Sequence, residues 1–238
     1  MTKLKYLQKF FFLLVMGISL CAVQACSDDD DDDDDSSKVL ENGNVMVSGH
    51  EAVDLGLSVK WATCNVGSYT PEGCGEYYAW GETETKSDYS WETYKWCEGT
   101  AKTLTKYCTD DEYGKVDNRI VLTSSDDVAT VKWGKKWRIP TKEEIEELID
   151  ECMWTMTTQN GMNGFLVVGP SGKSIFLPAA GCRYGTGLNG RGFDGGYWSA
   201  TLHEHYSYDA YCLYFNDVGR WGRNCRRDYG LTVRPVTE

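Results

Sequence analysis

The 238-residue sequence is short of positive charge, proline and histidine. Lysine and arginine together number 24 against 36 aspartates and glutamates, a formal net charge of -12. Nucleic-acid binding needs a basic surface, so we expect no nucleic-acid partner. Only 5 prolines occur, and residues 44–238 contain no Pro/Ser-rich linker, no block of charge and no clear internal repeat. These absences predict one folded domain over residues 44–238.

Motifs that would indicate catalysis or metal binding are also missing. The chain has no Ser/His/Asp order of a hydrolase, no phosphate-binding glycine loop and no distinct pair of carboxylates. With 3 histidines and no Cys-x2-Cys pair, a zinc site is disfavoured. We therefore expect no enzyme activity and no resident cofactor.

Glycine and aromatic residues are abundant instead. The chain has 25 glycines, 9 tryptophans and 15 tyrosines, and 41% of its residues are hydrophobic. Such a composition excludes wholesale disorder and is typical of a loop-rich binding domain.

The first 26 residues have the order of an export signal. Three lysines precede an apolar run over residues 10–20, and small residues follow up to Cys26. A retained transmembrane helix is the alternative, but the run is near the lower length limit for spanning a bilayer. The segment resembles a bacterial lipoprotein signal, with Ala25 before the cysteine. The resemblance implies removal of residues 1–25 and acylation of Cys26, which would anchor the chain in a lipid bilayer. An ordinary thiol behind a conventional signal is the other interpretation.

Eight consecutive aspartates occupy residues 28–35. Repulsion between them predicts an extended, solvated tether, which we assign to residues 26–43. The run can be a plain spacer, but an acidic run after a lipidated cysteine also resembles the surface-export signal of lipoproteins in the Gram-negative gut phylum. We therefore expect an outer-membrane, lipid-anchored protein exposed on the cell surface.

Helices are predicted near the middle of the chain and strands on both sides of them. Thr141 and Glu144 have capping-box spacing, and apolar residues then recur at helical intervals, which predicts an amphipathic helix over residues 141–151. Asp126 and Asp127 precede a second, shorter helix over 128–133. Strands are expected at 45–47, 53–62, 164–168, 174–177, 196–200, 211–215 and 231–236. This order predicts an α+β domain with two central helices, short antiparallel strands and long loops.

Six ordered motifs resemble one known family. They are VDLGLSVKWATCNVG at 53–67, YYAWGE at 77–82, WGKKWRIPTKEEIEEL at 133–148, SIFLPAAGCR at 174–183, GYWSAT at 196–201 and GLTVRPV at 230–236. Together they resemble the Fibrobacter succinogenes major paralogous domain, a family of surface lipoproteins with a C-type-lectin-like fold. WRIPTKEEIEEL and GLTVRPV more distantly resemble the formylglycine-generating, sulfatase-modifying fold. The resemblance implies that the N- and C-terminal strands pair and that a long loop region presents a ligand surface, but it implies no activity.

Eight cysteines remain beyond residue 26, and an even number on an exported chain favours disulfides. Cys97 with Cys108, and Cys212 with Cys225, are the local pairs that would each close a short loop. Buried free thiols are the alternative for Cys64, Cys152 and Cys182.

Two short motifs suggest metal ligands. His203-Glu204-His205 lacks a third ligand, and on a strand its glutamate would face away from both histidines. Phe215-Asn216-Asp217 is similar to the Trp-Asn-Asp calcium signature of sugar-binding C-type lectins, whose companion Glu-Pro-Asn or Gln-Pro-Asp element is absent. A calcium-dependent site is thus an open alternative to a plain turn at Asn216-Asp217.

The stretch 202–228 is the candidate ligand-binding region, because rigid aromatic rings, guanidinium groups and amides are what recognition surfaces use. Its alternate residues Tyr211, Leu213 and Phe215 are expected to be core. The candidate ligand contacts are His203, His205, Tyr206, Tyr208, Asn216, Asp217, Arg220, Trp221, Arg223, Asn224, Arg226 and Arg227.

We expect these residues to bind an extracellular glycan or protein. In some C-type-lectin-like proteins the same stretch is diversified by a retroelement, and its richness in Tyr, Asn, Asp, Arg and Gly raises that idea here. The alternative function is a structural or adhesin-assembly component of the cell envelope that has a protein partner.

Overall fold

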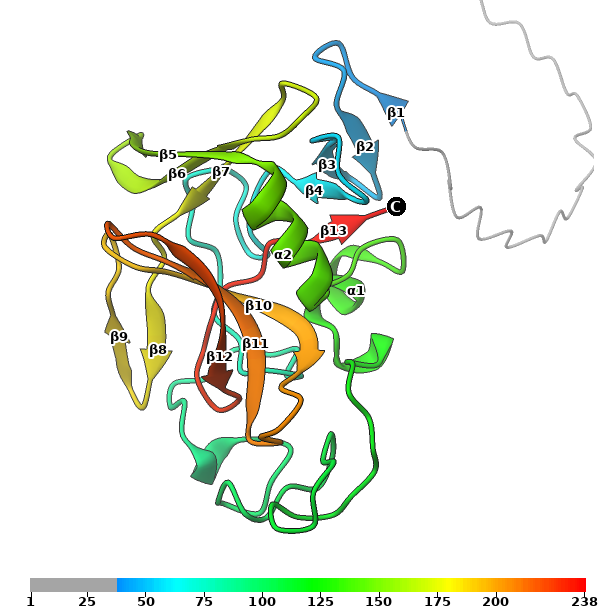
Figure 1. The fold of residues 1–238 in the computed structure, drawn as a ribbon, viewed down its shortest axis with the longest axis vertical. Coiled ribbons are helices and arrows are strands. Elements are labelled where there is room, and N and C mark those ends of the chain that lie inside the picture. Colours follow the sequence, from blue (N-terminus) through cyan, green and yellow to red (C-terminus); the bar gives the residue numbers. More distant parts are fainter. Residues whose placement is uncertain (1–37) are drawn as a thin grey trace, which may run out of the picture. The chain divides into compact units, whose positions relative to one another are not determined.

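A computed structural model describes residues 38–238. The expected signal, Cys26 and the aspartate run lie outside the described residues. Of the described part, 36% is strand and 11% helical. The predicted α+β class with two central helices, and the C-type-lectin-like fold attached to it, are therefore wrong: the domain is β-rich and built from several antiparallel sheets (Figure 1). No helix in residues 38–238 is long and apolar enough to cross a membrane.

The first sheet joins the two ends of the described chain. Its strand order is β1-β2-β3-β4-β13, and every neighbouring pair in it is antiparallel. In register, Val236 lies opposite Trp61. Pairing of N- and C-terminal strands is thus confirmed, as Figure 1 shows for β4 and β13. The bounds are β1 Lys38–Val39, β2 Val45–Val47, β3 His50–Val53, β4 Lys60–Ala62 and β13 Val236–Thr237.

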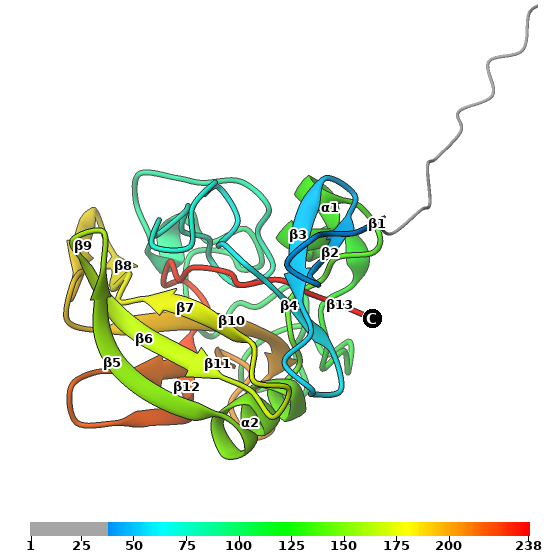
Figure 2. The same cartoon turned by 90° about the horizontal axis from the view of Figure 1, so that it is seen from above.

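Two three-stranded antiparallel sheets and a hairpin form the rest. One sheet has the order β5-β6-β7, the other β10-β11-β12, and β8 pairs with β9. Figure 2 shows these strands together on one side of the domain, apart from β1 to β4. Their bounds are β5 Met153–Gln159, β6 Met162–Val168, β7 Ser174–Pro178, β8 Cys182–Tyr184, β9 Gly187–Asn189, β10 Gly195–Leu202, β11 Asp209–Phe215 and β12 Arg220–Arg226.

Both predicted helices are present. Helix α2, Lys142–Glu151, begins after Thr141, whose side chain accepts from the Glu144 amide while the Glu144 carboxylate accepts from the Thr141 amide. The predicted apolar face is buried at Ile145 and Leu148. The shorter α1, Val128–Trp133, begins after Asp127, whose carboxylate accepts from the Thr130 and Ile139 amides.

Three clusters of buried side chains hold the elements together. One lies around Trp80, Trp137 and Trp198, and a second lies between α2 and the sheets that contain β6 and β11. The third packs Tyr89, Tyr94 and Leu104 inside the long segment 82–118. That segment has no strand, and its regular structure is limited to the 3-10 turn η1, Trp91–Thr93. The expectation of long loops therefore holds for this segment.

The error in fold class comes from strands whose sequences lack apolar alternation. Strand β5 reads MWTMTTQ, with most side chains exposed, and β12 reads RWGRNCR. Strands β8 and β9 are short and flanked by glycine. Backbone pairing with a neighbouring strand stabilises all four, and composition does not reveal such pairing. The predicted strands at 53–62 and 231–236 form only at their ends, as parts of β3, β4 and β13.

Candidate functional site

The two surfaces of β11 point into different environments, because successive strand residues alternate between faces. Asp209, Tyr211, Leu213 and Phe215 face α2, where the Lys142 ammonium lies 4.6 Å from the Tyr211 ring centroid. The expectation that Tyr211, Leu213 and Phe215 belong to the core holds fully for Leu213 and Phe215, which are 1% exposed, while Tyr211 is half-buried.

The opposite face of β11 forms a cleft with the β8–β9 hairpin. The cleft has a volume of about 200 Å³. We call it the Tyr214 cleft, and six of its lining side chains are Cys182, Asn189, Asp194, Tyr214, Arg223 and Tyr229. Of the predicted contacts, Arg223 lines this cleft directly.

Three aromatic and cationic groups are layered along the rim of the Tyr214 cleft. The Trp221 ring stacks beside Tyr214 with centroids 6.1 Å apart and planes at 25°. The Arg223 guanidinium carbon lies 4.5 Å from the Tyr214 centroid. Burial, together with a hydrogen bond to Asp194, raises the pKa of Tyr214. The Tyr214 phenol therefore stays protonated at neutral pH and is held in place by the carboxylate.

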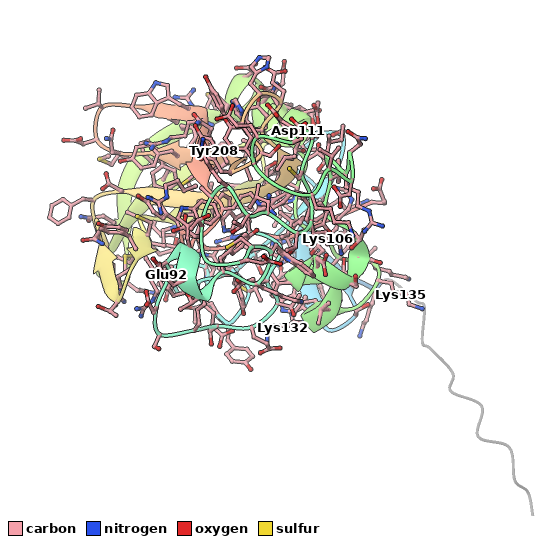
Figure 3. The ribbon with its side chains drawn as sticks, turned by 90° about the horizontal axis from the view of Figure 1, so that it is seen from below. Glu92, Lys106, Asp111, Lys132, Lys135 and Tyr208 are labelled. Atoms are coloured by element: carbon pink, nitrogen blue, oxygen red, sulfur yellow. The ribbon has the colours of Figure 1, made fainter. Side chains whose placement is uncertain are left out.

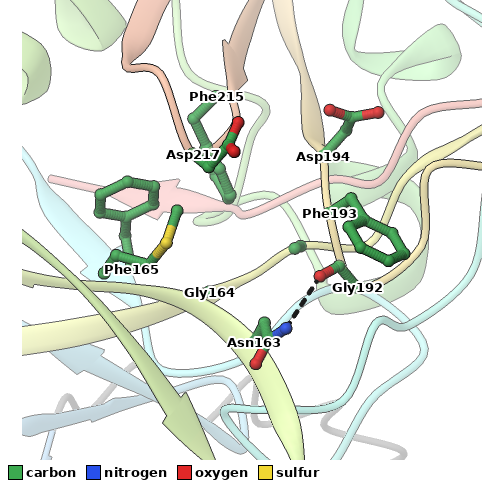
Figure 4. A pocket seen from close by; sticks show the side chains of 10 residues that line it. Asn163, Gly164, Phe165, Gly192, Phe193, Asp194, Phe215 and Asp217 are labelled. Carbon is green, nitrogen blue, oxygen red and sulfur yellow. Dashed lines mark hydrogen bonds between the residues drawn. The ribbon is translucent and has the colours of Figure 1, made fainter.

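A second cleft, the Phe193 cleft, lies beside the β11–β12 turn, with Phe215 and Asp217 in its lining (Figure 4). Its volume is about 160 Å³. Its lining is mostly apolar, and the Asn163 amide donates to the Gly192 carbonyl at 3.0 Å across one side. The side chains that define it are Met156, Asn163, Phe165, Phe193, Asp194 and Asp217.

Asp194 lines both clefts, so the two are adjacent. It is positioned by the turn before β10, where the Asp194 amide donates to the Gly190 carbonyl at 2.7 Å. Gly190 has φ +70°, and a Cβ there would lie 2.3 Å from the Asp194 carboxylate. Only glycine allows this close approach.

None of the eight cysteines in residues 38–238 forms a disulfide. The predicted Cys97–Cys108 pair is not formed, because the Cys97 thiol donates to the Trp91 carbonyl and the Cys108 thiol donates to the Asp110 carbonyl. Cys212 and Cys225 are neighbours but remain thiols, and both line the Tyr214 cleft with Cys182. The adjacent Cys225 thiol and burial raise the pKa of Cys212 well above its usual value. Such a thiol is a poor nucleophile at neutral pH.

The loop between β10 and β11 carries a row of neighbouring rings that also contacts Tyr113, and we call this set the aromatic row. Centroids are separated by 5.1 Å for Tyr113–Tyr208, 5.5 Å for Tyr206–Tyr208 and 5.3 Å for His203–Tyr206. Burial lowers the pKa of His203. Figure 3 shows Tyr208 and Asp111 near each other on the same face.

The histidines of this loop lie in a turn between β10 and β11. His203 Nδ1 accepts from the backbone amides of His205 and Tyr206. The segment 203–206 is therefore a turn, and the alternation of a strand does not apply to its side chains. His205 is exposed. No group of three His, Cys, Asp or Glu side chains within residues 38–238 is arranged to hold a metal ion.

Asn216 and Asp217 form the turn between β11 and β12. The Asn216 side chain accepts from the Val218 amide at 2.9 Å, which confirms the turn as its local role. Asp217 is exposed and faces the Phe193 cleft.

Arg227 does not belong to the surface. Its side chain is 0% exposed, and its guanidinium donates to the Tyr94 hydroxyl and to the carbonyls of Lys106, Tyr107 and Ser207. It also lies 4.9 Å from the Trp80 ring centroid. The prediction that Arg227 contacts ligand is therefore wrong: all of its hydrogen bonds are internal, and it fixes the loop 203–208 against segment 82–118.

The remaining predicted contacts are spread along β12. Arg220 lies 5.3 Å from the Trp154 centroid and donates to the Ile149 carbonyl. Asn224 donates to the buried Asp209 carboxylate, and Arg226 makes two hydrogen bonds to Asp228. These interactions orient β12, whereas the exposed Trp221 and Arg223 side chains lie against the Tyr214 ring.

Sequence reasoning missed several lining residues. Asp194, Asn189 and Phe193 lie in a glycine-rich segment without periodicity, and Met156 lies in the unpredicted β5. The sequence carries one usable signal for this segment, the run of glycines between 181 and 196, which marks close backbone approach.

No family model matches the chain, and no curated protein or solved structure shows a significant match to it.

Proposed function

We propose that this protein is a cell-surface lipoprotein that binds an extracellular glycan in the two clefts beside the β11–β12 turn. The observation that carries the proposal is the arrangement in the Tyr214 cleft, where Arg223 and Trp221 flank one tyrosine ring opposite Asn189 and Asp194. Sugar rings pack on aromatic faces, while their hydroxyls need both donors and acceptors. Arg223 supplies donors, Asp194 accepts and Asn189 can do both.

The size of the site supports a ligand of more than one sugar unit. Each cleft alone is small compared with the 300–1,000 Å³ common for pockets of drug-sized ligands. Because the clefts adjoin at Asp194, an oligosaccharide can place one unit in each. The lipid anchor at Cys26 and its tether belong to the same proposal, since an extracellular ligand requires surface display.

The test is binding of the full-length protein, in detergent, to a panel of neutral, acidic and N-acetylated glycans. Trp221→Ala and Arg223→Ala each remove an exposed cleft side chain, and we expect affinity for any bound glycan to fall about tenfold or more. Tyr69→Ala and Arg119→Ala are matched controls at exposed positions outside the clefts and leave binding unchanged. A chelator arm decides whether calcium takes part.

The proposal is contradicted if no glycan of the panel binds, or if a glycan binds equally well to the protein with either cleft substitution. One observation favours the second candidate function, an assembly component with a protein partner. Phe193 is 78% and Val218 81% exposed, and both lie at the Phe193 cleft or the turn beside it. Exposed apolar side chains that gather at one place favour protein contact. One stoichiometric envelope partner, lost on Phe193→Ala, would establish that function.

A further inference from the structure

Strand β12 is the outer strand of its sheet. It pairs with β11 on one side, and within residues 38–238 no strand pairs with its other side. Figure 2 shows β12 at the border of the three strands, with no other described strand beyond it. The opposite border is covered, because residues of β10 form bridges with Thr232, Val121 and Gly181. Only the β12 border of this sheet is therefore available to a further strand.

The register shows which backbone groups of β12 point outward. In an antiparallel pair, alternate residues direct their N–H groups to the partner strand. The Asn216 amide donates to the Gly219 carbonyl at one end, and the Arg227 amide donates to the Tyr208 carbonyl at the other. Odd-numbered residues of β12 therefore bond to β11. The amides of Arg220, Gly222, Asn224 and Arg226 point away from it.

Strand β12 is also richer in basic residues than the rest of the described chain. Residues 38–238 hold 21 basic and 28 acidic side chains, a net charge of -7. Strand β12 contains three arginines and no acid. Arg226 is paired with Asp228, but neither Arg220 nor Arg223 forms an ion pair within the described residues. Arg220 packs on the Trp154 ring and its Nε is buried, so Arg223 is the exposed arginine of β12 that lacks an ion pair within the described residues.

Charge decides which occupant fits this edge. Charged edge strands keep proteins from pairing with their own copies, and three arginines on β12 repel a second β12. An acidic strand would instead place carboxylates beside guanidiniums. Cross-strand pairs of opposite charge stabilise a sheet, while like charges destabilise it.

We propose that the outer edge of β12 is a docking surface for an extended, acidic segment of a partner protein, which adds to the sheet as a fourth strand. The outward amides and the carbonyls of Arg220 and Gly222 supply sequence-independent hydrogen bonds, since the carbonyls of Asn224 and Arg226 already accept from Arg223 Nε and the Tyr229 amide. The arginines select for acidic residues. This surface uses the backbone edge of β12, whereas the glycan clefts use side chains, and the two share Arg223.

The probe is a labelled peptide, Val-Glu-Val-Glu-Val-Glu-Val, titrated into the full-length protein in detergent by fluorescence polarisation. Gly222→Pro removes one outward N–H without touching the bonds to β11. Gly222→Ala is the matched control, since a Cβ at residue 222 meets nothing within 4 Å. We expect Gly222→Pro to weaken binding about tenfold or more, and Gly222→Ala by less than about twofold.

Two further peptides test the proposal on the unchanged protein, so that the result does not depend on whether the proline variant folds. The same peptide with alternate N-methyl groups cannot bond to an edge and should not bind the unchanged protein. A Lys-for-Glu peptide should not bind either, and salt should weaken the Glu peptide. Amide exchange at Gly222 and Asn224 should slow on binding of the Glu peptide.

Absence of binding by the Glu peptide, equal binding by the proline and alanine variants, or binding of the N-methylated peptide would each overturn the proposal. Self-association of the full-length protein that Gly222→Pro abolishes would also overturn it, because the occupant would then be a second copy of this chain. Glycan binding retained by Gly222→Pro would separate this surface from the clefts.

Discussion

Arg223 and Arg227 lie four residues apart in the same stretch and have opposite environments. Arg223 is exposed above the Tyr214 ring, whereas Arg227 is fully buried among three aromatic rings and four hydrogen-bond acceptors. The change occurs where β12 ends at Arg226 and the chain turns inward. The comparison teaches that one residue type, in one apparently uniform sequence, serves a surface in one place and the core a few residues later.

Removal of the buried guanidinium should have the largest effect. Arg227→Ala leaves a cavity and four unsatisfied acceptors, so we expect a loss of about 3–5 kcal/mol in the free energy of unfolding. Arg223→Ala should change it by less than about 0.5 kcal/mol. Urea denaturation of both variants measures the difference. Similar losses in the two variants would remove the contrast.

Two glycines sharpen the same contrast between packed and open positions of one sheet. A Cβ at Gly195 would lie 2.1 Å from the Phe215 ring, which is itself held against Phe165 and Tyr197. Gly195→Ala should therefore cost about 1–3 kcal/mol. Gly222→Ala meets open space and should stay within about 0.5 kcal/mol of the unchanged protein. Thermal unfolding of the two single variants measures this difference. Equal melting temperatures would contradict the described packing of β10 on β11.

We expect the smallest effect on stability at Asn224, which is exposed on β12 but bonds to the buried Asp209. Burial raises the pKa of Asp209 above its ordinary 3.8, and the hydrogen bond from Asn224 opposes that rise. Asn224→Ala should cost about 1 kcal/mol at neutral pH. Because the folded-state pKa then rises further, the folded state binds more protons than the unfolded one. The deficit should be small near about pH 3 and complete above the raised pKa.

Denaturation of Asn224→Ala across pH measures this dependence. In an Asp209→Asn background the pH dependence of the Asn224→Ala deficit should vanish. A deficit that grows toward acid pH would mean that Asn224 stabilises the protonated form of Asp209 and not the carboxylate.

Much of the local structure was predictable because it depends on neighbouring residues. The capping box at Thr141, the apolar face of α2, and the apolar strands β6, β7, β10 and β11 all follow from spacing. Strands β5 and β12 did not follow, since their exposed, polar residues are ordered by pairing with β6 and β11. Missing these edge strands led to the wrong fold class.

The region of the candidate site was predictable from the sequence, but the residues that line it were not. The aromatic and arginine content of 202–228 indicated the region, and Trp221 and Arg223 are exposed at the Tyr214 cleft or beside it. The burial of Arg227 and the contribution of Asp194 depend on contacts with Tyr107 and Tyr214, which are distant in sequence. Such contacts leave no periodic trace in the chain. Membership of the paralogous family, lipid anchoring at Cys26 and surface display stay predictions.

The pairing of β13 with β4 has a consequence for the order of folding. Hairpins such as β5–β6 and β10–β11 close over short loops, but Val236 must find Trp61 across most of the described chain. Closing a long loop costs more entropy and slows the search for contacts. The pairing of β13 with β4, which completes the first sheet, should therefore form last, after the hairpins of the domain. Until that step, β4 keeps an open edge, and the half-folded chain is the species most exposed to mispairing and to proteases.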